Sequence, residues 1–273
     1  MSKNKCLKVE NIWYNICNGG DIMGSNTNGF ENESNLIDYL NGKRYFELND
    51  NFKKFIRFIF GEVNKESKIK ACSGKSGQKP DLIIEINDVK KYVSVKVGTG
   101  NSVHQEEIEM FMNFLNTLPI SEVSKIELLK FHWADGTYDG TGKIRVSSAE
   151  YKKEHAEEIK LINREVNKKE VLPIIINRVL FQGKSNLYEP AEYIYYGDIN
   201  MGQWASKEEI INYILNNSFS NNSIHFGPLS YQIWNRCLNF NPNTEDRRNV
   251  MQIKWGSLPA DLLIIESERN ESE

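Results

Sequence analysis

The chain has few of the residues that commonly bind zinc or build a disulfide framework. Its 273 residues include four cysteines and four histidines, all widely spaced and without a Cys-x-x-Cys pair. This pattern excludes the common paired-cysteine zinc sites and argues against a disulfide framework. The N-terminus also lacks the apolar core of a signal peptide, and the longest apolar runs are too short to span a bilayer. We therefore expect a cytoplasmic protein with no membrane segment.

The chain also lacks an excess of basic residues. It has 34 Lys and Arg against 37 Asp and Glu, which gives a net charge of −3. This balance does not indicate nucleic-acid binding, but it does not exclude it, because a local basic groove matters more than the total charge. The length allows one large core, and we expect a single domain over residues 1–273.

Residues 82–86 and 92–97 are predicted to form the two strands of a β-hairpin. Both runs are rich in apolar and β-branched residues, and an Asn-Asp pair between them supplies a turn. Because side chains alternate along a strand, Asp81 and Lys96 can converge on one face of the sheet. Charged groups on an otherwise apolar sheet are costly to bury without partners, so the pair indicates a functional site. The alternative is an ordinary surface hairpin with both charges solvated.

The order of Pro80-Asp81, an apolar strand, a turn and Ser94-Val95-Lys96 resembles the PD-(D/E)xK nuclease superfamily, which includes many restriction endonucleases and DNA-repair nucleases. The signature of that superfamily is an aspartate on one strand and an acidic-x-lysine triplet on the next. The chain departs from it at Ser94, where a second carboxylate is usual. The resemblance implies an α/β fold with a restriction-endonuclease-like core, that is, a mixed central β-sheet flanked by helices. We expect a C-terminal α+β elaboration after this core.

The resemblance also implies hydrolysis of phosphodiester bonds that depends on Mg²⁺, with Mn²⁺ as a substitute. Asp81 would be a metal ligand, and the backbone carbonyl of Val95 would complete the coordination. Lys96 would orient or activate the attacking water and offset charge in the transition state.

With Ser94 in the acidic position, another carboxylate is needed, and we expect Glu33 to supply it from a helix before the hairpin. A glutamate near a helix N-terminus is also explained by the helix dipole alone. Glu85 is on the right face, but it lies about 13 Å beyond Asp81 on a regular strand, too far to share one ion. Gln105, at the start of a helix expected after the hairpin, is a candidate to support the catalytic site, although it also suits a solvated helix face.

The order of predicted elements extends the resemblance to residues 28–135, which we expect to contain the catalytic core. A helix over 103–116 would cross over to a third strand at 125–133, parallel to the strand of Lys96. Residues 146–273 would form the elaboration. The other predicted segments are helices near 33–40, 50–60, 148–168, 171–181 and 206–216, and extended segments at 193–196, 224–234 and 250–255.

Two further groups of residues are candidates for DNA contact. Lys75 and Lys79 lie on a glycine-bearing loop before the hairpin and suit phosphate contacts, although solvated loop lysines are the commoner outcome. The C-terminal part mixes aromatic, amide and basic side chains, which suits the reading of base edges and suits a Trp-rich core just as well. The candidates there are Gln232, Asn235, Arg236, Gln252 and Lys254.

We predict a Mg²⁺-dependent endonuclease that cuts double-stranded DNA at a specific site, as type II restriction endonucleases do, and that works as a homodimer. Within the same fold, a DNA-repair or resolvase nuclease is the nearest alternative. A catalytically idle member of the fold that binds nucleic acid or a partner protein is the alternative from another class, and Ser94 is its best argument. The third alternative is an unrelated α/β protein.

Overall fold

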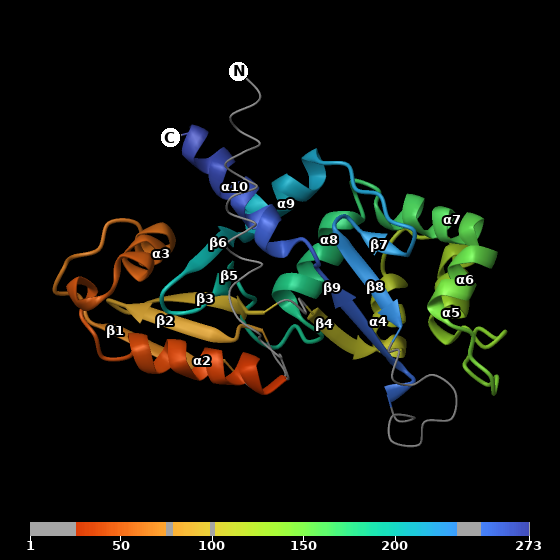
Figure 1. Ribbon diagram of the computed structural model, residues 1–273, viewed down its shortest axis with the longest axis horizontal. Coiled ribbons are helices and arrows are strands. Elements are labelled where there is room, and N and C mark those ends of the chain that lie inside the picture. Colours follow the sequence, from red (N-terminus) through yellow and green to blue (C-terminus); the bar gives the residue numbers. More distant parts are fainter. Residues whose placement is uncertain (1–25, 75–78, 99–101, 234–246, 273) are drawn as a thin grey trace.

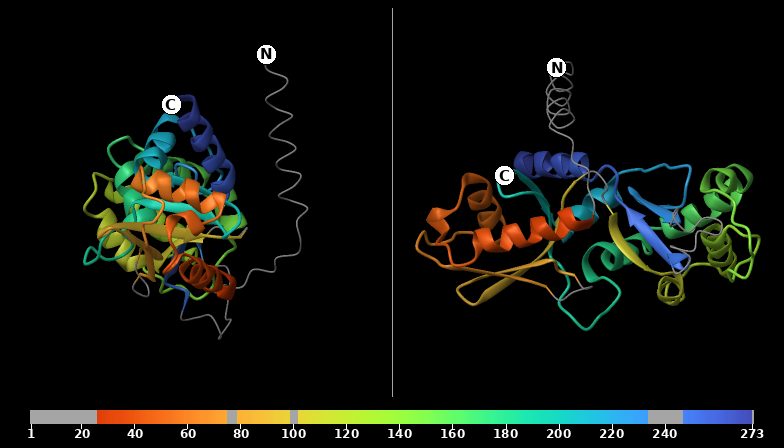
Figure 2. Two further views of the ribbon diagram at one scale, coloured as in Figure 1. Left: turned by 90° about the vertical axis from the view of Figure 1, so that its left-hand side faces the viewer. Right: turned by 60° about the horizontal axis from the view of Figure 1, so that its bottom comes forward.

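Two β-sheets lie side by side along the long axis of the molecule (Figure 1). The computed structural model describes residues 26–74, 79–98, 102–233 and 247–272. The helices of residues 26–60 pack around one sheet, and those of residues 108–166 pack around the other (Figure 2). The architecture is therefore mixed α/β, as the sequence predicts. No described helix is long and apolar enough to cross a membrane.

The first sheet joins the predicted hairpin to strands from much later in the chain. In spatial order its strands are β1 (Ile69–Ser73), β2 (Leu82–Ile86), β3 (Val89–Lys96), β5 (Tyr193–Gly197) and β6 (Gly202–Ser206). β5 runs parallel to β3, and the other neighbours are antiparallel, so the sheet is mixed. The strand predicted at 193–196 is confirmed. The sheet takes strands from both sides of the boundary expected between residues 28–135 and 146–273.

A two-residue turn sets the register of the hairpin. Asn87 and Asp88, the predicted turn, have φ angles of 49° and 65°. Left-handed conformations at both central residues match the twist of a tight β-hairpin. Leu82 consequently lies opposite Val93. Because side chains alternate, the aspartate just before β2 faces the same side as Ser94.

Two helices enclose the core of the first sheet, α2 (Asn26–Leu40) and α3 (Asp50–Phe60), with the short 3-10 helix η1 (Tyr45–Glu47) between them. The sequence predicts both α-helices, although α2 begins earlier than expected. Asn49 caps α3, and its side chain accepts a hydrogen bond from the N–H of Phe52. The shared core includes Phe52, Phe55, Ile84 and Val93, all buried.

The second sheet contains a strand where the sequence predicts a helix. In spatial order its strands are β4 (Ser102–Glu107), β9 (Val250–Lys254), β8 (Leu229–Ile233) and β7 (His225–Phe226), all antiparallel. The helix predicted over 103–116 is therefore wrong in its first half, and α4 (Ile108–Leu115) begins only after β4. β4 is extended because it pairs with β9, a partner that no local pattern reveals. The extended segments predicted at 224–234 and 250–255 contain β7, β8 and β9.

The third strand predicted at 125–133 is also wrong, because this segment lies in helix α5 (Glu122–Trp133). Ser121 caps the helix by accepting a hydrogen bond from the N–H of Ser124. The Leu, Glu and Lys residues of the segment are good helix formers, and they outweigh the apolar run that suggested a strand. Leu128 and Phe131 pack into the core of the second sheet.

The remaining helices follow the predictions more closely. The helix predicted at 148–168 is divided into α6 (Ser148–Glu154) and α7 (Ala156–Val166). The helix predicted at 171–181 begins as α8 (Leu172–Ile176) and continues as the π-helical segment η2 (Asn177–Gln182). Ser206 and Glu209 form the predicted capping box of α9 (Lys207–Asn216). The last helix, α10 (Leu258–Ser272), packs against β6 and α9.

Candidate functional site

Asp81 lies directly before β2, where the start of that strand meets the end of β3. Its backbone N–H donates to the carbonyl of Val93 over 3.1 Å, which continues the hairpin pairing. This register sets Asp81 opposite Ser94, and Lys96 follows two positions further along the same face. The structure therefore brings together the aspartate and the lysine that the sequence predicts to converge.

The carboxylate of Asp81 is the centre of a compact hydrogen-bonded group. Its Oδ2 atom accepts from Oγ of Ser94 at 3.0 Å, from the N–H of Val95 at 2.8 Å and from Nζ of Lys96 at 3.1 Å. Nζ of Lys96 also lies 2.8 Å from Oγ of Ser94 and 2.7 Å from the carbonyl oxygen of Val95. Among the described residues, all three hydrogen bonds to this carboxylate go to Oδ2. Oδ1 therefore remains for a further partner.

The surroundings of Asp81 keep it ionised. Burial raises the pKa of Asp81, but the positive charges of Lys96 and Lys79 and the hydrogen bonds from Lys96 and Val95 hold the net pKa below its ordinary value. The Lys96 and Asp81 side chains are 15% and 20% exposed, so a ligand can reach them from solvent. The pair is therefore both charged and accessible.

Glu33, on α2, interacts with this group through its charge, and no described hydrogen bond or ion pair joins it to Asp81 or Lys96. The side chain of the preceding residue, Asn32, donates to the carbonyl of Gly197 at the end of β5, and β5 is the strand that pairs with the end of β3. Burial and the negative charge of Asp81 raise the pKa of Glu33 to about 7, while the positive charge of Lys96 opposes the shift. The structure thus places the predicted second carboxylate within electrostatic reach of Asp81 and Lys96.

Ser94 connects the charged groups without adding a charge. Its side chain is fully buried. Its hydroxyl donates to Asp81 and accepts from Lys96, so it holds the two charged groups together. Glu85, the other carboxylate on this face, binds Lys70 and Lys90 at the far end of β2 and does not take part in the site.

Lys79 has a different role from the predicted phosphate contact. Its ammonium donates to the carbonyl oxygens of Val103, Val179 and Leu180, at the start of β4 and in η2. Burial and the positive charge of Lys96 hold its pKa well below the ordinary value, and the charge of Asp81 opposes this only in part. Hydrogen bonds to the three carbonyls favour the ammonium form. Three N–H groups therefore meet three carbonyls, and Lys79 ties the entry of the hairpin to the second half of the molecule.

A buried ionic group joins β4 to η2, the two elements that Lys79 contacts. Glu106, whose side chain is fully buried, lies 2.6 Å from Nη2 of Arg178 and 2.9 Å from Nε2 of His104. Burial and the charge of Lys79 lower the pKa of His104 despite the opposing effect of Glu106, so the imidazole is neutral at pH 7. Arg178 is therefore the cationic partner that a buried carboxylate requires. Sequence reasoning missed this group because Arg178 lies 72 residues from Glu106 in the chain.

Gln105 does not lie on a helix, as predicted, but on the exposed face of β4. It pairs across the sheet with Gln252 of β9, which in turn pairs with Gln232 of β8. Ser102, Lys254 and Ser230 form the neighbouring row on the same three strands. We call these two rows the polar sheet face; its members are Ser102, Gln105, Ser230, Gln232, Gln252 and Lys254.

The polar sheet face gathers three of the predicted DNA contacts with Gln105, but no described hydrogen bond or ion pair joins Gln105 to Asp81 or Lys96. Its amide lies 3.4 Å from Oγ of Ser102 instead. Apart from Lys79, the remaining predicted DNA contacts, Lys75, Asn235 and Arg236, lie outside the described residues.

Substitution of Lys79 by methionine tests its structural role. We expect Lys79→Met to lower the free energy of unfolding by about 3 kcal/mol, because three carbonyl groups lose their donor. The exposed Lys169→Met should change it by less than about 0.5 kcal/mol. Urea unfolding followed by circular dichroism measures both. If Lys79→Met is as stable as the unaltered chain but binds nucleic acid more weakly, the predicted phosphate contact of Lys79 would be supported instead.

No protein-family model matches the chain, and no curated protein matches it either.

Proposed function

We propose that the chain is a Mg²⁺-dependent endonuclease of the PD-(D/E)xK type that hydrolyses phosphodiester bonds of double-stranded DNA. The observation that carries this proposal is the contact of Asp81 with Lys96 across the hairpin, at 3.1 Å and partly open to solvent. A mixed sheet with helices around it is compatible with a restriction-endonuclease-like core. The site-specific cutting of a type II restriction endonuclease, by a homodimer, is the form of this activity that we propose.

The donor atoms of the site fit a magnesium ion. Magnesium prefers oxygen ligands and is commonly held by one or two carboxylates together with water and phosphate oxygens. Asp81, through Oδ1, Glu33 and the carbonyl of Val95 are oxygen donors of this kind. Among the described residues there is no group of three or more His, Cys, Asp or Glu side chains that could hold a metal, and the proposed site has two carboxylates, those of Asp81 and Glu33. When bound, the ion would polarise the phosphate and lower the pKa of a coordinated water.

The side chains then have separate roles. Asp81 stays ionised at neutral pH and supplies a permanent negative charge. Lys96, already held by Asp81 and Ser94, would orient the attacking water and offset the charge that develops on a phosphate oxygen. Nζ of Lys96 also contacts the carbonyl of Val95, and because a carbonyl oxygen has two lone pairs, the second remains for a metal ion.

The polar sheet face is the surface that we propose for DNA recognition. Its amide groups each offer a donor and an acceptor, as base edges require, and Lys254 offers a charge for phosphate. Neighbouring strands are about 4.8 Å apart, so a row of three glutamines spans about 10 Å, close to the width of the major groove. The face begins at Ser102, shortly after Lys96 in the chain.

The buried hydroxyl of Ser94 supports a second candidate function, a catalytically idle member of the fold that binds nucleic acid. Ser94 occupies the position of a carboxylate that the superfamily signature includes, and its bonds to Asp81 and Lys96 keep the pair in place without a metal ion. Such a protein would bind DNA through the polar sheet face but leave it intact.

Cleavage of DNA separates the two candidates. We expect the chain to cut unmethylated phage DNA into discrete bands in the presence of Mg²⁺ and to do nothing in EDTA. Asp81→Asn and Lys96→Ala should lower the rate at least about 100-fold, because they remove a metal ligand and the charge that faces the phosphate. Glu85→Gln, a carboxylate change on the same strand outside the site, should cut normally. Failure to cut several unmodified and modified DNAs, with retained binding in a gel shift, would favour the idle protein.

Metal affinity should depend on the ionisation of Glu33. Since its pKa is raised to about 7, the carboxyl group is mostly protonated at pH 6 and mostly ionised at pH 8. Mn²⁺ should therefore bind more tightly as the pH rises, by about tenfold between these values, when followed by calorimetry. Glu33→Gln should bind weakly and with no pH step in this range. A flat profile for the unaltered chain would remove Glu33 from the metal site.

DNA recognition by the polar sheet face predicts different defects for its two kinds of residue. Lys254→Ala should weaken binding to all sequences and reduce the slope of log affinity against log salt by about 1. Gln252→Ala should cost about 1–3 kcal/mol on the cleaved sequence and little on unrelated DNA of equal length. Fluorescence anisotropy in Ca²⁺ over a salt series measures both, with Lys169→Ala as the control. Wild-type binding by both variants would exclude this face.

A further inference from the structure

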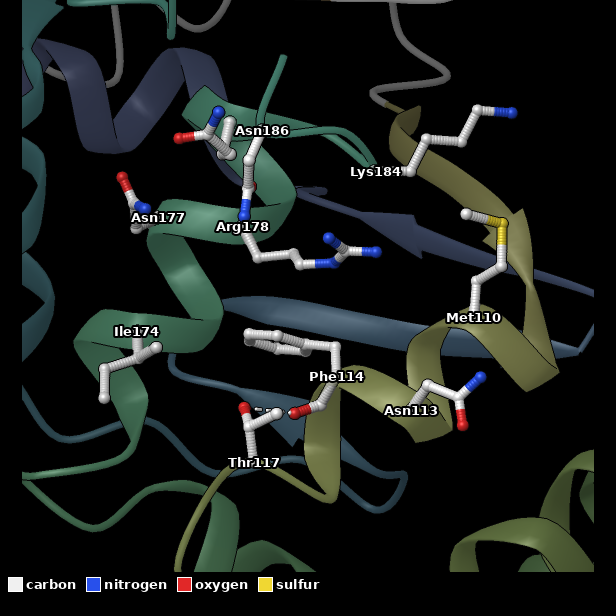
Figure 3. Close-up of a pocket in the computed structure, with 10 residues that line it drawn as sticks. Met110, Asn113, Phe114, Thr117, Ile174, Asn177, Arg178, Lys184 and Asn186 are labelled. Carbon is white, nitrogen blue, oxygen red and sulfur yellow. Dashed lines mark hydrogen bonds between the residues drawn. The ribbon is translucent and has the colours of Figure 1, made fainter.

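A cavity of about 610 Å³ lies between α4 and the α8–η2 segment (Figure 3), and the described residues that line it include neither Asp81 nor Lys96. Its volume falls within the range typical of small-molecule sites, about 300–1,000 Å³. Phe114 of α4 contributes an aromatic ring on one side, and Arg178 of η2 crosses the hollow above that ring (Figure 3). The cavity is therefore large enough for a ligand with one planar and one polar part.

The guanidinium of Arg178 is held in place before any ligand arrives. Its central carbon lies 5.0 Å from the centre of the Phe114 ring, and Nη2 lies 2.6 Å from the fully buried carboxylate of Glu106. A guanidinium fixed in this way presents a flat, cationic surface. Nucleobases stack on such planes and on aromatic rings in many nucleic-acid sites.

The rest of the lining is polar and lacks acids. Asn113, Asn177, Gln182 and Asn186 supply four carboxamides, and Lys184 supplies a second cation. Each carboxamide offers a donor and an acceptor, the pattern that matches the edges of bases. None of the described residues that line the cavity is an aspartate or glutamate. Because Glu106 offsets the charge of Arg178, the lining favours a ligand with several hydrogen-bonding groups and a stacking surface, and Lys184 is the cation that remains for an anionic part.

We propose that this cavity binds a nucleotide. The base would stack against Arg178 beside Phe114, and the carboxamides would contact its edge. Lys184, whose exposed side chain extends away from Arg178 in Figure 3, would turn toward the phosphate. The nucleotide can come from solution, or it can be turned out of a nucleic-acid strand, as enzymes that act on bases do. Binding requires neither Asp81 nor a metal ion, so this proposal stands apart from the proposed nuclease activity.

The segment η2 links the cavity to the Asp81 site. Arg178 and Gln182 of η2 line the cavity, whereas the carbonyls of Val179 and Leu180, between them in the chain, accept hydrogen bonds from Lys79. A nucleotide held in the cavity would thus contact the same short helical segment that anchors the entry of the catalytic hairpin.

Binding measured in EDTA tests the cavity without cleavage at the Asp81 site. Calorimetry with the four deoxynucleoside 5′-monophosphates examines the free ligand. Anisotropy with a duplex that carries one unpaired nucleotide, beside the fully paired duplex, examines a nucleotide within a strand. Asn113→Asp places a negative charge in the cavity at nearly constant size, and Lys184→Ala removes the second cation. Both positions are exposed, so the fold should survive, and Lys169→Ala is the matched control.

We expect each cavity variant, but not the control, to weaken binding at least tenfold. Loss of monophosphate binding would support the proposal with a free nucleotide as ligand. Loss of only the preference for the unpaired duplex would support it with a nucleotide turned out of a strand. If neither probe binds at millimolar concentration, or if the cavity variants bind as the unaltered chain does, the proposal is overturned. Cleavage of DNA by the folded cavity variants tests the proposed nuclease activity separately, because these variants keep Asp81 and Lys96.

Discussion

The two-residue turn at Asn87 and Asp88 is the constraint on which the candidate site depends. Side chains on a strand alternate between faces, so a slip of one residue would move Lys96 to the opposite face from Asp81. Left-handed φ angles at both turn residues close the hairpin in one register. Backbone geometry at an exposed turn therefore decides whether a carboxylate and an ammonium meet at the other end of the hairpin.

The contact of Asp81 with Lys96 concentrates charge at the site. The pKa values of Asp81 and Glu33 are shifted there in opposite directions. Lys96 and its neighbours keep Asp81 ionised, whereas burial and the charge of Asp81 raise the pKa of Glu33 to about 7. A divalent cation between them would favour the ionised form of both groups and replace repulsion by attraction. The two carboxylates, rather than the net charge of −3, are the feature of the proposed site that would attract a cation.

Local sequence patterns were sufficient where the contacting residues are neighbours in the chain. The hairpin, the α9 capping box and the contact of Asp81 with Lys96 all follow from turn chemistry, capping and alternation. The wrong strand at 125–133 is a local failure, because helix-forming residues outweigh its apolar run, whereas the other failures involve long-range pairing. β4 is extended because of β9, and β3 finds its parallel partner almost a hundred residues later, in β5. The sequence alone suggests a solvated loop lysine at Lys79, because it does not reveal the contact of this lysine with η2.

The serine at position 94 lets the site fold without a cation to offset a second buried carboxylate. A carboxylate there would be fully buried beside the ionised Asp81, and two like charges at hydrogen-bond distance would require a cation to offset the cost. The neutral hydroxyl bonds to both Asp81 and Lys96, so the pair is balanced in the absence of metal. The second carboxylate of the proposed site is that of Glu33, on a helix. Glu33 is half-exposed, and its protonation relieves the repulsion between it and Asp81. Metal binding at the proposed site would thereby be separated from folding and tied to pH.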